Sequence, residues 1–133
     1  MKLRSLIRRL FSLPPYWRSI QACERSDYRR ALSDYETYRG RVGKERPSDR
    51  AFHAKLLILN SEGGEAAAKL RELIDDLETG ADPSRNTLSA YVLAYSKMTL
   101  AGLMGDAKRG EFFRIAASHD PPTWLKKVLP IAR

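Results

Sequence analysis

The sequence predicts an all-α protein in which about three antiparallel helical hairpins stack into a right-handed α-solenoid. Apolar residues recur at intervals of three and four along most of the 133 residues, a pattern typical of amphipathic helices. Glycine, proline and capping residues divide the chain into short segments, and no stretch shows the sustained alternation of a strand. The expected hairpins recur about every forty residues, which is the spacing of a helical-repeat solenoid.

Residues 2–13 predict a basic amphipathic helix that forms a unit of its own. Pro14-Pro15 ends this segment, because proline lacks a backbone donor and restricts the residue before it. The rest of the chain, 14–133, is expected to form one helical-repeat domain with a capping helix at each end. The apolar side of the first segment carries Leu3, Leu6, Ile7, Leu10 and Phe11, and its basic side carries Lys2, Arg4, Arg8 and Arg9.

The first hairpin is expected from helices over residues 16–25 and 27–40. Ser26 or Asp27 supplies the N-cap of the second helix. In that helix Tyr28, Leu32 and Tyr35 share one face, and the small Ala31 lets a neighbouring helix approach closely. The glycines expected to end it are Gly40 and Gly43.

The second hairpin is expected over residues 49–60 and 65–77, with Ser48 as the N-cap and Gly63-Gly64 as the break between its helices. The wide apolar band of the first of these helices predicts a central position in the fold. The third hairpin is expected over residues 84–103 and 107–118. Its limits are Asp82-Pro83, Gly105-Asp106 and Asp120-Pro121, and a last short helix carries Trp124, Leu125, Val128 and Leu129 before Pro130.

The net charge of +8 is concentrated in the first part of the chain. Residues 1–50 contain 13 Lys and Arg against 6 Asp and Glu, whereas residues 51–133 contain 11 against 10. A basic face of this kind attracts nucleic acid, anionic lipid or an acidic partner. The single cysteine, Cys23, excludes an intrachain disulfide and is expected to be a small buried thiol.

No apolar run is long enough for a spanning helix, and Arg8 and Arg9 interrupt the segment that would serve as a signal peptide. The protein is therefore expected in the cytoplasm. If residues 2–13 bind lipid, it is peripheral to the inner face of a membrane.

The run Asp27-Tyr28-x-x-Ala31-Leu32-x-x-Tyr35 resembles the turn and second helix of tetratricopeptide repeats. Gly105-Asp106-Ala107-x-x-Gly110-x-x-Phe113 is similar, with glycine in the small position. The stretch from Leu70 to Lys97, with Gly80-Ala81-Asp82-Pro83 and then Asn86-Thr87-Leu88-x-x-Tyr91, resembles the pentatricopeptide class that reads single-stranded RNA. The tetratricopeptide resemblance implies a degenerate α-solenoid scaffold that holds an extended peptide or a helix of another protein in a concave groove.

The function expected from this resemblance is a non-enzymatic protein–protein interaction module, a scaffold or adaptor, that needs no cofactor. The groove is expected along the first helix of each hairpin. The residues predicted to line it are Arg18, Gln21, Lys55, Tyr91 and Tyr95.

Two alternatives use the basic part of the chain. The first is an RNA- or ribosome-associated module whose phosphate contacts come from Arg25, Arg29, Arg30, Arg39, Arg41, Lys44 and Arg46. The second is a peripheral membrane adaptor, in which residues 2–13 insert apolar side chains and place arginines at anionic headgroups. Its contact residues are Arg4, Leu6, Arg8, Arg9, Leu10 and Phe11; the same segment would otherwise cap the fold or dock in a partner.

Catalytic and metal sites are not expected. His53 lies within an apolar helix and is expected to be packed, and His119 belongs to an expected turn, so neither has the partners of a zinc site or a nucleophile. The acidic residues Asp75, Asp76, Glu78 and Asp82 cluster at a helix end, where solvation is the simpler explanation. Trp17, Trp124 and most tyrosines are expected in the core rather than stacked on nucleobases.

Overall fold

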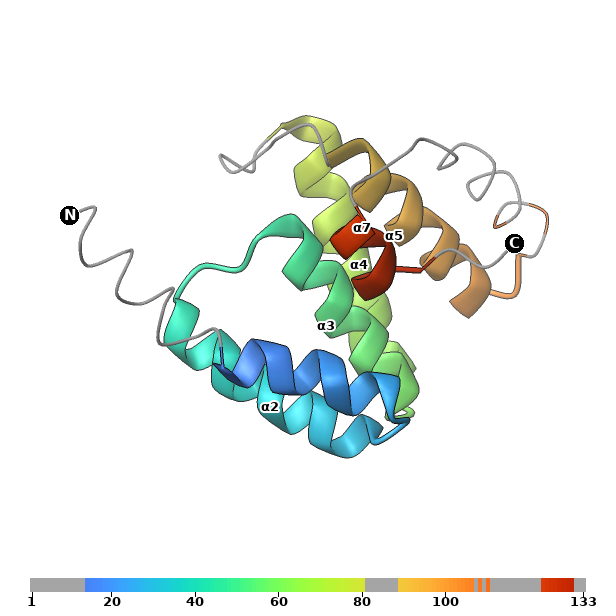
Figure 1. Cartoon of the computed structure of the whole chain (residues 1–133). Coiled ribbons are helices and arrows are strands. Elements are labelled where there is room, and N and C mark those ends of the chain that lie inside the picture. The colour runs from blue at the N-terminus through green and yellow to red at the C-terminus, as the bar shows by residue number, and fades with distance from the viewer. Residues whose placement is uncertain (1–13, 81–88, 107, 109, 111–122, 131–133) are drawn as a thin grey trace.

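The computed structural model describes residues 14–80, 89–106, 108, 110 and 123–130, and every regular element in these ranges is helical (Figure 1). The all-α prediction is therefore confirmed for the described chain. A helix over residues 14–24 comes first. The later helices are α2 (Tyr28–Val42), α3 (Pro47–Leu59), α4 (Gly63–Thr79), α5 (Ser89–Leu103) and α7 (Thr123–Val128). The predicted helix over 2–13 and most of the one over 107–118 lie outside the described residues.

Helices that are neighbours in sequence pack against each other. Helix 14–24 and α2 run side by side (Figure 1), and the Ser19 hydroxyl donates to the Ala31 carbonyl at 2.7 Å. Ala31 is completely buried, so the close approach expected at this small residue is present. Further along, α3 packs on α2, α4 and α5, and α4 packs on α5.

Helix α3 is central, as its wide apolar band predicts. Its residues Ala51 to Ala54, Leu56 and Leu57 are buried, and they contribute to both apolar clusters of the core. The helix begins one residue before the expected cap, because Pro47 occupies its first position and the Asp49 carboxylate accepts the Arg46 backbone N–H at 3.1 Å. Ser48 is thus a buried residue of the first turn and not the N-cap.

Two expected glycine breaks are misplaced. Helix α2 passes through Gly40 and ends at Val42, followed by Gly43 at φ +80°. Gly63 and Gly64 are the first residues of α4, and the chain reverses before them at Ser61, which has a φ of +64°. Gly80, at φ +70°, follows the last residue of α4, and Gly105, at φ +75°, turns the chain after α5.

Helix α7 comes late in the sequence but packs against residues from the first half of the chain. Its side chains Leu125 and Val128, and Leu129 directly after it, are buried in the same apolar cluster as Tyr16, Ile20 and Phe52. The described helices include none that could cross a membrane.

Candidate functional site

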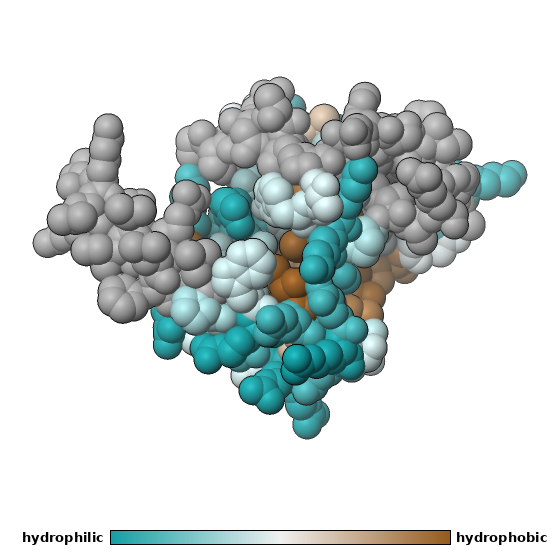
Figure 2. Space-filling view, viewed as in Figure 1, coloured by the Kyte–Doolittle hydropathy of each residue, from teal (hydrophilic) through white to brown (hydrophobic). Residues whose placement is uncertain are grey.

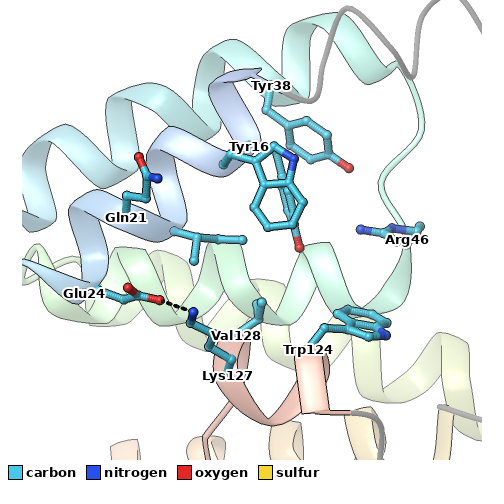
Figure 3. Close-up of a pocket in the computed structure, with 10 residues that line it drawn as sticks. Tyr16, Gln21, Glu24, Tyr38, Arg46, Trp124, Lys127 and Val128 are labelled. Atoms are coloured by element: carbon cyan, nitrogen blue, oxygen red, sulfur yellow. Dashed lines mark ion pairs between the residues drawn. The ribbon is translucent and has the colours of Figure 1, made fainter.

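A cleft of about 540 Å³ opens between helix 14–24 and α7 (Figure 3). Figure 2 shows hydrophobic surface at this hollow, framed by hydrophilic side chains. The apolar and aromatic lining comes from Tyr16, Trp17, Ile20, Tyr38, Trp124 and Val128. The polar lining comes from Gln21, Glu24, Arg46 and Lys127. A mostly apolar hollow with a few polar groups is the usual composition of a binding site.

Both tryptophans of the chain line this cleft, and both are unusually exposed. Trp17 is 56% exposed and Trp124 is 40% exposed, so the expectation that they lie in the core is wrong. Trp17 packs edge-on against Tyr16, with ring centroids 6.1 Å apart. Large aromatic side chains that keep so much surface in water are costly to expose and favour a contact with another molecule.

The sequence does contain a signal for this site. Trp17, Gln21 and Glu24 follow one another at helical spacing, so they share a face of helix 14–24 that is otherwise polar. The buried residues of the same helix are Pro15, Tyr16, Ser19, Ile20 and Ala22. A tryptophan placed on the polar face of an amphipathic helix therefore predicts a contact surface rather than core.

Arg46 forms a cationic bridge across the end of the cleft. Its guanidinium carbon lies 5.7 Å from the Tyr16 ring centroid and 5.6 Å from that of Trp124, within the range of cation–π attraction. Figure 3 shows Tyr16 entering from helix 14–24, Trp124 from α7, and Arg46 from the loop before α3.

Asp49 holds Arg46 in this position. The Arg46 guanidinium donates to the two Asp49 carboxylate oxygens at 3.1 and 3.2 Å, and the Tyr38 hydroxyl donates to one of them at 2.6 Å. Asp49 is completely buried. Burial disfavours the charged guanidinium, but its hydrogen bonds to Asp49 and the negative charge of that carboxylate outweigh this and raise the pKa of Arg46. The wall of the cleft is thus braced by an ion pair between the buried Asp49 and the partly exposed Arg46.

One polar group of the cleft is left without a partner. The Tyr16 hydroxyl is buried and has no hydrogen-bond partner in the described chain. Burial, followed by the nearby Asp49 carboxylate, raises the pKa of Tyr16 to about 12, so the hydroxyl stays protonated at neutral pH. At the mouth of the cleft, the Lys127 ammonium pairs with the Glu24 carboxylate at 3.4 Å (Figure 3).

A second polar network lies behind this wall and is structural. The Tyr35 hydroxyl donates to the Glu45 carboxylate and to the Asp49 carbonyl, and Lys69 pairs with Glu45 at 3.4 Å. Burial alone would raise the pKa of Glu45, but the Tyr35 hydrogen bond and the Lys69 charge lower it. These groups are paired with each other, and they connect α2 to the loop before α3 and to α4.

His53 is packed, as expected. It is 2% exposed, stacks on the Tyr35 ring at 4.8 Å, and its Nε2 lies 2.8 Å from a Glu36 carboxylate oxygen. Burial, and next the charge of Lys69, lowers the pKa of His53. Cys23 is half-buried against the core.

The residues predicted to line a groove differ in exposure and in the contacts they make. Arg18 and Gln21 are exposed on helix 14–24. Lys55 donates to the Val128 carbonyl at 3.3 Å, and the Tyr91 hydroxyl donates to the Leu129 carbonyl at 2.7 Å. Tyr91 and Tyr95 are only 6% and 5% exposed. The contacts of α7 therefore occupy the surface expected for a partner near Lys55 and Tyr91, and Gln21 is the predicted groove residue that lines the cleft.

The basic residues proposed for RNA are mostly exposed, and Figure 2 shows hydrophilic side chains over helix 14–24 and α2. Arg39 pairs with Glu36 and Glu45, and Arg46 is held by Asp49. The residues proposed for membrane contact, Arg4, Leu6, Arg8, Arg9, Leu10 and Phe11, all lie outside the described part of the chain.

In the acidic cluster predicted to be a solvated helix end, Asp75 is exposed and two other residues form ion pairs. Asp76 accepts from Arg50 at 2.8 Å and Glu78 from Lys97 at 3.0 Å, while Asp82 lies outside the described residues. Among the residues that the structure describes, no three His, Cys, Asp or Glu side chains are placed to hold a metal ion. Comparison of the chain with protein-family models, curated proteins and solved structures finds no match.

Proposed function

We propose that the protein is a non-enzymatic interaction module that holds a peptide or helix of another protein in the aromatic cleft between helix 14–24 and α7. The observation that carries this proposal is the pair of exposed tryptophans, Trp17 and Trp124, on the two walls of one cleft. Tryptophan, tyrosine and arginine are the residues that most often dominate the energy of protein–protein binding. All three line this cleft.

The cleft is suited to an apolar side chain that anchors a partner. Its volume lies within the usual range for a binding pocket, and Ile20 and Val128 add aliphatic surface between the rings. The Tyr16 hydroxyl supplies an unused donor for a carbonyl of the bound chain. The Arg46–Asp49 pair keeps the aromatic walls in place before binding, which reduces the ordering cost of association.

A tetratricopeptide-like arrangement is the fold we propose for this scaffold. Helix 14–24 with α2, and α3 with α4, would be its first two hairpins, and the packing of successive helices on each other supports this. Helix α7 would then lie along the first helices, where such scaffolds hold a partner helix. Its buried Leu125 and Val128 support a preference of this surface for aliphatic side chains.

Peptide selection with the full chain tests the proposal. A phage-displayed library of random dodecapeptides is selected on the immobilised protein, and a selected peptide is titrated while tryptophan emission is recorded. Because both tryptophans of the chain line the cleft, binding there should change the emission. Trp17→Ala should weaken binding by about tenfold or more, as expected for an interface residue of this type.

Met104→Ala is the matched control, because Met104 is also 56% exposed and does not line the cleft. Its affinity should equal that of the unmodified protein. Failure to select any peptide, or equal loss of affinity in both variants, would refute the proposed function.

RNA binding is the second candidate, and the charge of helix 14–24 and α2 favours it. Arg18, Arg25, Arg29 and Lys44 are exposed and form no ion pair within the described residues. A gel-shift assay with single-stranded RNA at two salt concentrations tests this candidate, because each phosphate contact adds roughly −0.7 to the slope of log affinity against log salt. Absence of retardation at low salt would exclude it.

A further inference from the structure

Three arginines surround a small depression beside the aromatic cleft. It lies between helix 14–24 and the start of α2 and has a volume of about 110 Å³. Its lining consists of Arg18, Gln21, Ala22, Arg25, Asp27 and Arg30. Arg18, Gln21 and Arg25 recur at intervals of three and four and are all exposed, so they form one stripe along the helix, beside the buried Ala22.

The positive charge of this depression is mostly uncompensated. Neither Arg18 nor Arg25 pairs with a carboxylate anywhere in the described residues. Arg30 has only a loose contact with Asp34, at 3.9 Å, and its side chain is 69% exposed. Asp27 is the single acidic group of the lining, and its carboxylate caps α2 by accepting the Arg30 backbone N–H.

An anion bound here would relieve the mutual repulsion of three guanidinium groups. The depression has room for a carboxylate, which an arginine binds through two parallel hydrogen bonds. Such charge-assisted bonds are stronger than those between neutral groups. The arrangement therefore favours an anionic side chain as the occupant.

The arginine depression and the aromatic cleft adjoin each other. Gln21 lines both of them, and both use the exposed side of helix 14–24. From Ile20 in the cleft to Arg25 in the depression the helix rises about 7.5 Å. This distance corresponds to about two residues of an extended peptide. A single short segment can therefore fill both sites.

We propose that the partner held by this protein is an acidic peptide that places a large apolar side chain in the aromatic cleft and a carboxylate among Arg18, Arg25 and Arg30. This inference rests on the proposed function and specifies the chemistry of its partner. The charge of the chain, +8 overall, is complementary to such a segment.

The acidic groups of the same surface favour a peptide over RNA. Glu24 lies at the mouth of the cleft and Asp27 in the depression. A nucleic acid carries a phosphate at every nucleotide and would pass both carboxylates at close range. A peptide that carries one or two carboxylates beside an apolar anchor meets the three arginines of the depression with Asp27 as the one acidic residue of the lining, and it brings no run of charge past Glu24, which is already paired with Lys127.

Selections on three proteins test the inference. The dodecapeptide library is selected on the unmodified chain, on the double variant Arg18→Glu with Arg25→Glu, and on Arg29→Glu. Arg29 is an exposed arginine of α2 that lines neither site, so it is the matched control for the change of charge. Thermal unfolding followed by circular dichroism verifies that all three proteins are folded.

The unmodified chain and Arg29→Glu should enrich peptides with an aromatic or aliphatic residue and Asp or Glu close to it. The double variant should retain the apolar preference and lose the acidic one. For one selected peptide, replacing its Asp and Glu by Asn and Gln should lower affinity for the unmodified chain by about tenfold near 0.05 M salt. The difference should shrink at about 1 M salt, where charges are screened within about 3 Å.

The outcomes separate the two proposals. Enrichment of apolar residues without acidic ones would overturn this inference and leave the proposed function standing. Binding of an oligouridine probe that is abolished in the double variant, together with no acidic enrichment, would overturn it in favour of RNA. Absence of any enriched peptide would remove both proposals.

Discussion

The Tyr91 hydroxyl donates a hydrogen bond of 2.7 Å to the Leu129 carbonyl and so joins α5 to the end of α7, 38 residues later in the chain. The Lys55 ammonium makes the corresponding contact with the Val128 carbonyl from α3. Both acceptors are backbone groups at the C-terminal end of α7, where carbonyls lack partners within the helix. Two side chains of the core helices thus cap a short helix whose other side carries Trp124.

Removing the Tyr91 hydroxyl should loosen α7. Tyr91→Phe deletes the donor and leaves the buried Leu129 carbonyl without it, which should lower the free energy of unfolding by about 1–2 kcal/mol. Hydrogen exchange of residues 123–130 should accelerate. Tyr28→Phe is the control, because the Tyr28 hydroxyl contacts only the exposed Ser26 hydroxyl at 3.5 Å. Unchanged exchange in Tyr91→Phe would show that the bond does not hold α7.

Removing the Asp49 carboxylate should be strongly destabilising. Asp49→Ala leaves the buried Tyr38 hydroxyl and the Arg46 guanidinium without their shared acceptor. The expected loss is about 3 kcal/mol, at the lower end for breaking a buried ion pair, because the Arg46 side chain can reach solvent. Urea unfolding measures it. Asp75→Ala, at an exposed carboxylate of α4, should change the free energy of unfolding little, and equal midpoints for the two variants would contradict the prediction.

His53 should make stability depend on pH in the acidic range. Its pKa in the folded protein is lowered by burial, so the unfolded chain binds the proton more readily. Its contribution to stability is therefore fully present above the unfolded pKa of about 6.5 and is lost as pH falls below it. His53→Gln should flatten the slope of unfolding free energy against pH below about 6.5.

His119 is present in both proteins, so the difference between their slopes reports His53 alone. The measurements should be made at several pH values above 4.5, the ordinary pKa of Glu45. The pKa of Glu45 in the folded protein is lower than this, so the carboxylate adds little to the pH dependence of stability in that range. Parallel curves for the two proteins would contradict the prediction.

Replacing Ser61 by glycine should not lower the stability of the folded protein. Its φ of +64° is a left-handed conformation, which costs a side-chain-bearing residue about 1–3 kcal/mol. Glycine adopts it without that cost but loses about 0.5–1 kcal/mol more backbone entropy on folding. Ser61→Gly should therefore leave stability unchanged or raise it by up to about 2 kcal/mol, whereas Ser61→Val should lower it. Chemical unfolding that shows Ser61→Val as the more stable variant would refute this account.

The sequence pattern predicted a helix or its end correctly where the deciding interactions lie within that segment. The central place of α3 follows from a band of apolar residues that only burial can satisfy, and Asp27 and Gly80 act as the caps that their chemistry predicts. The misplaced breaks at Gly40 and Gly63-Gly64 have the opposite cause. Glycine permits a turn but does not require one, and the left-handed residue between α3 and α4 is Ser61.

The candidate site depends on tertiary structure. Trp17 and Trp124 are far apart in the sequence and meet because α7 docks on the core through Leu125 and Val128. The same docking covers Tyr91, which the sequence placed in an open groove. The sequence by itself determined the helical class and most of the apolar residues that face the core, because both are set by neighbours within a turn or two; it misplaced the helix ends at Gly40 and Gly63 and the side of Trp17. Only the tertiary structure decided which apolar sides cover each other, because that depends on the packing of segments distant in the chain.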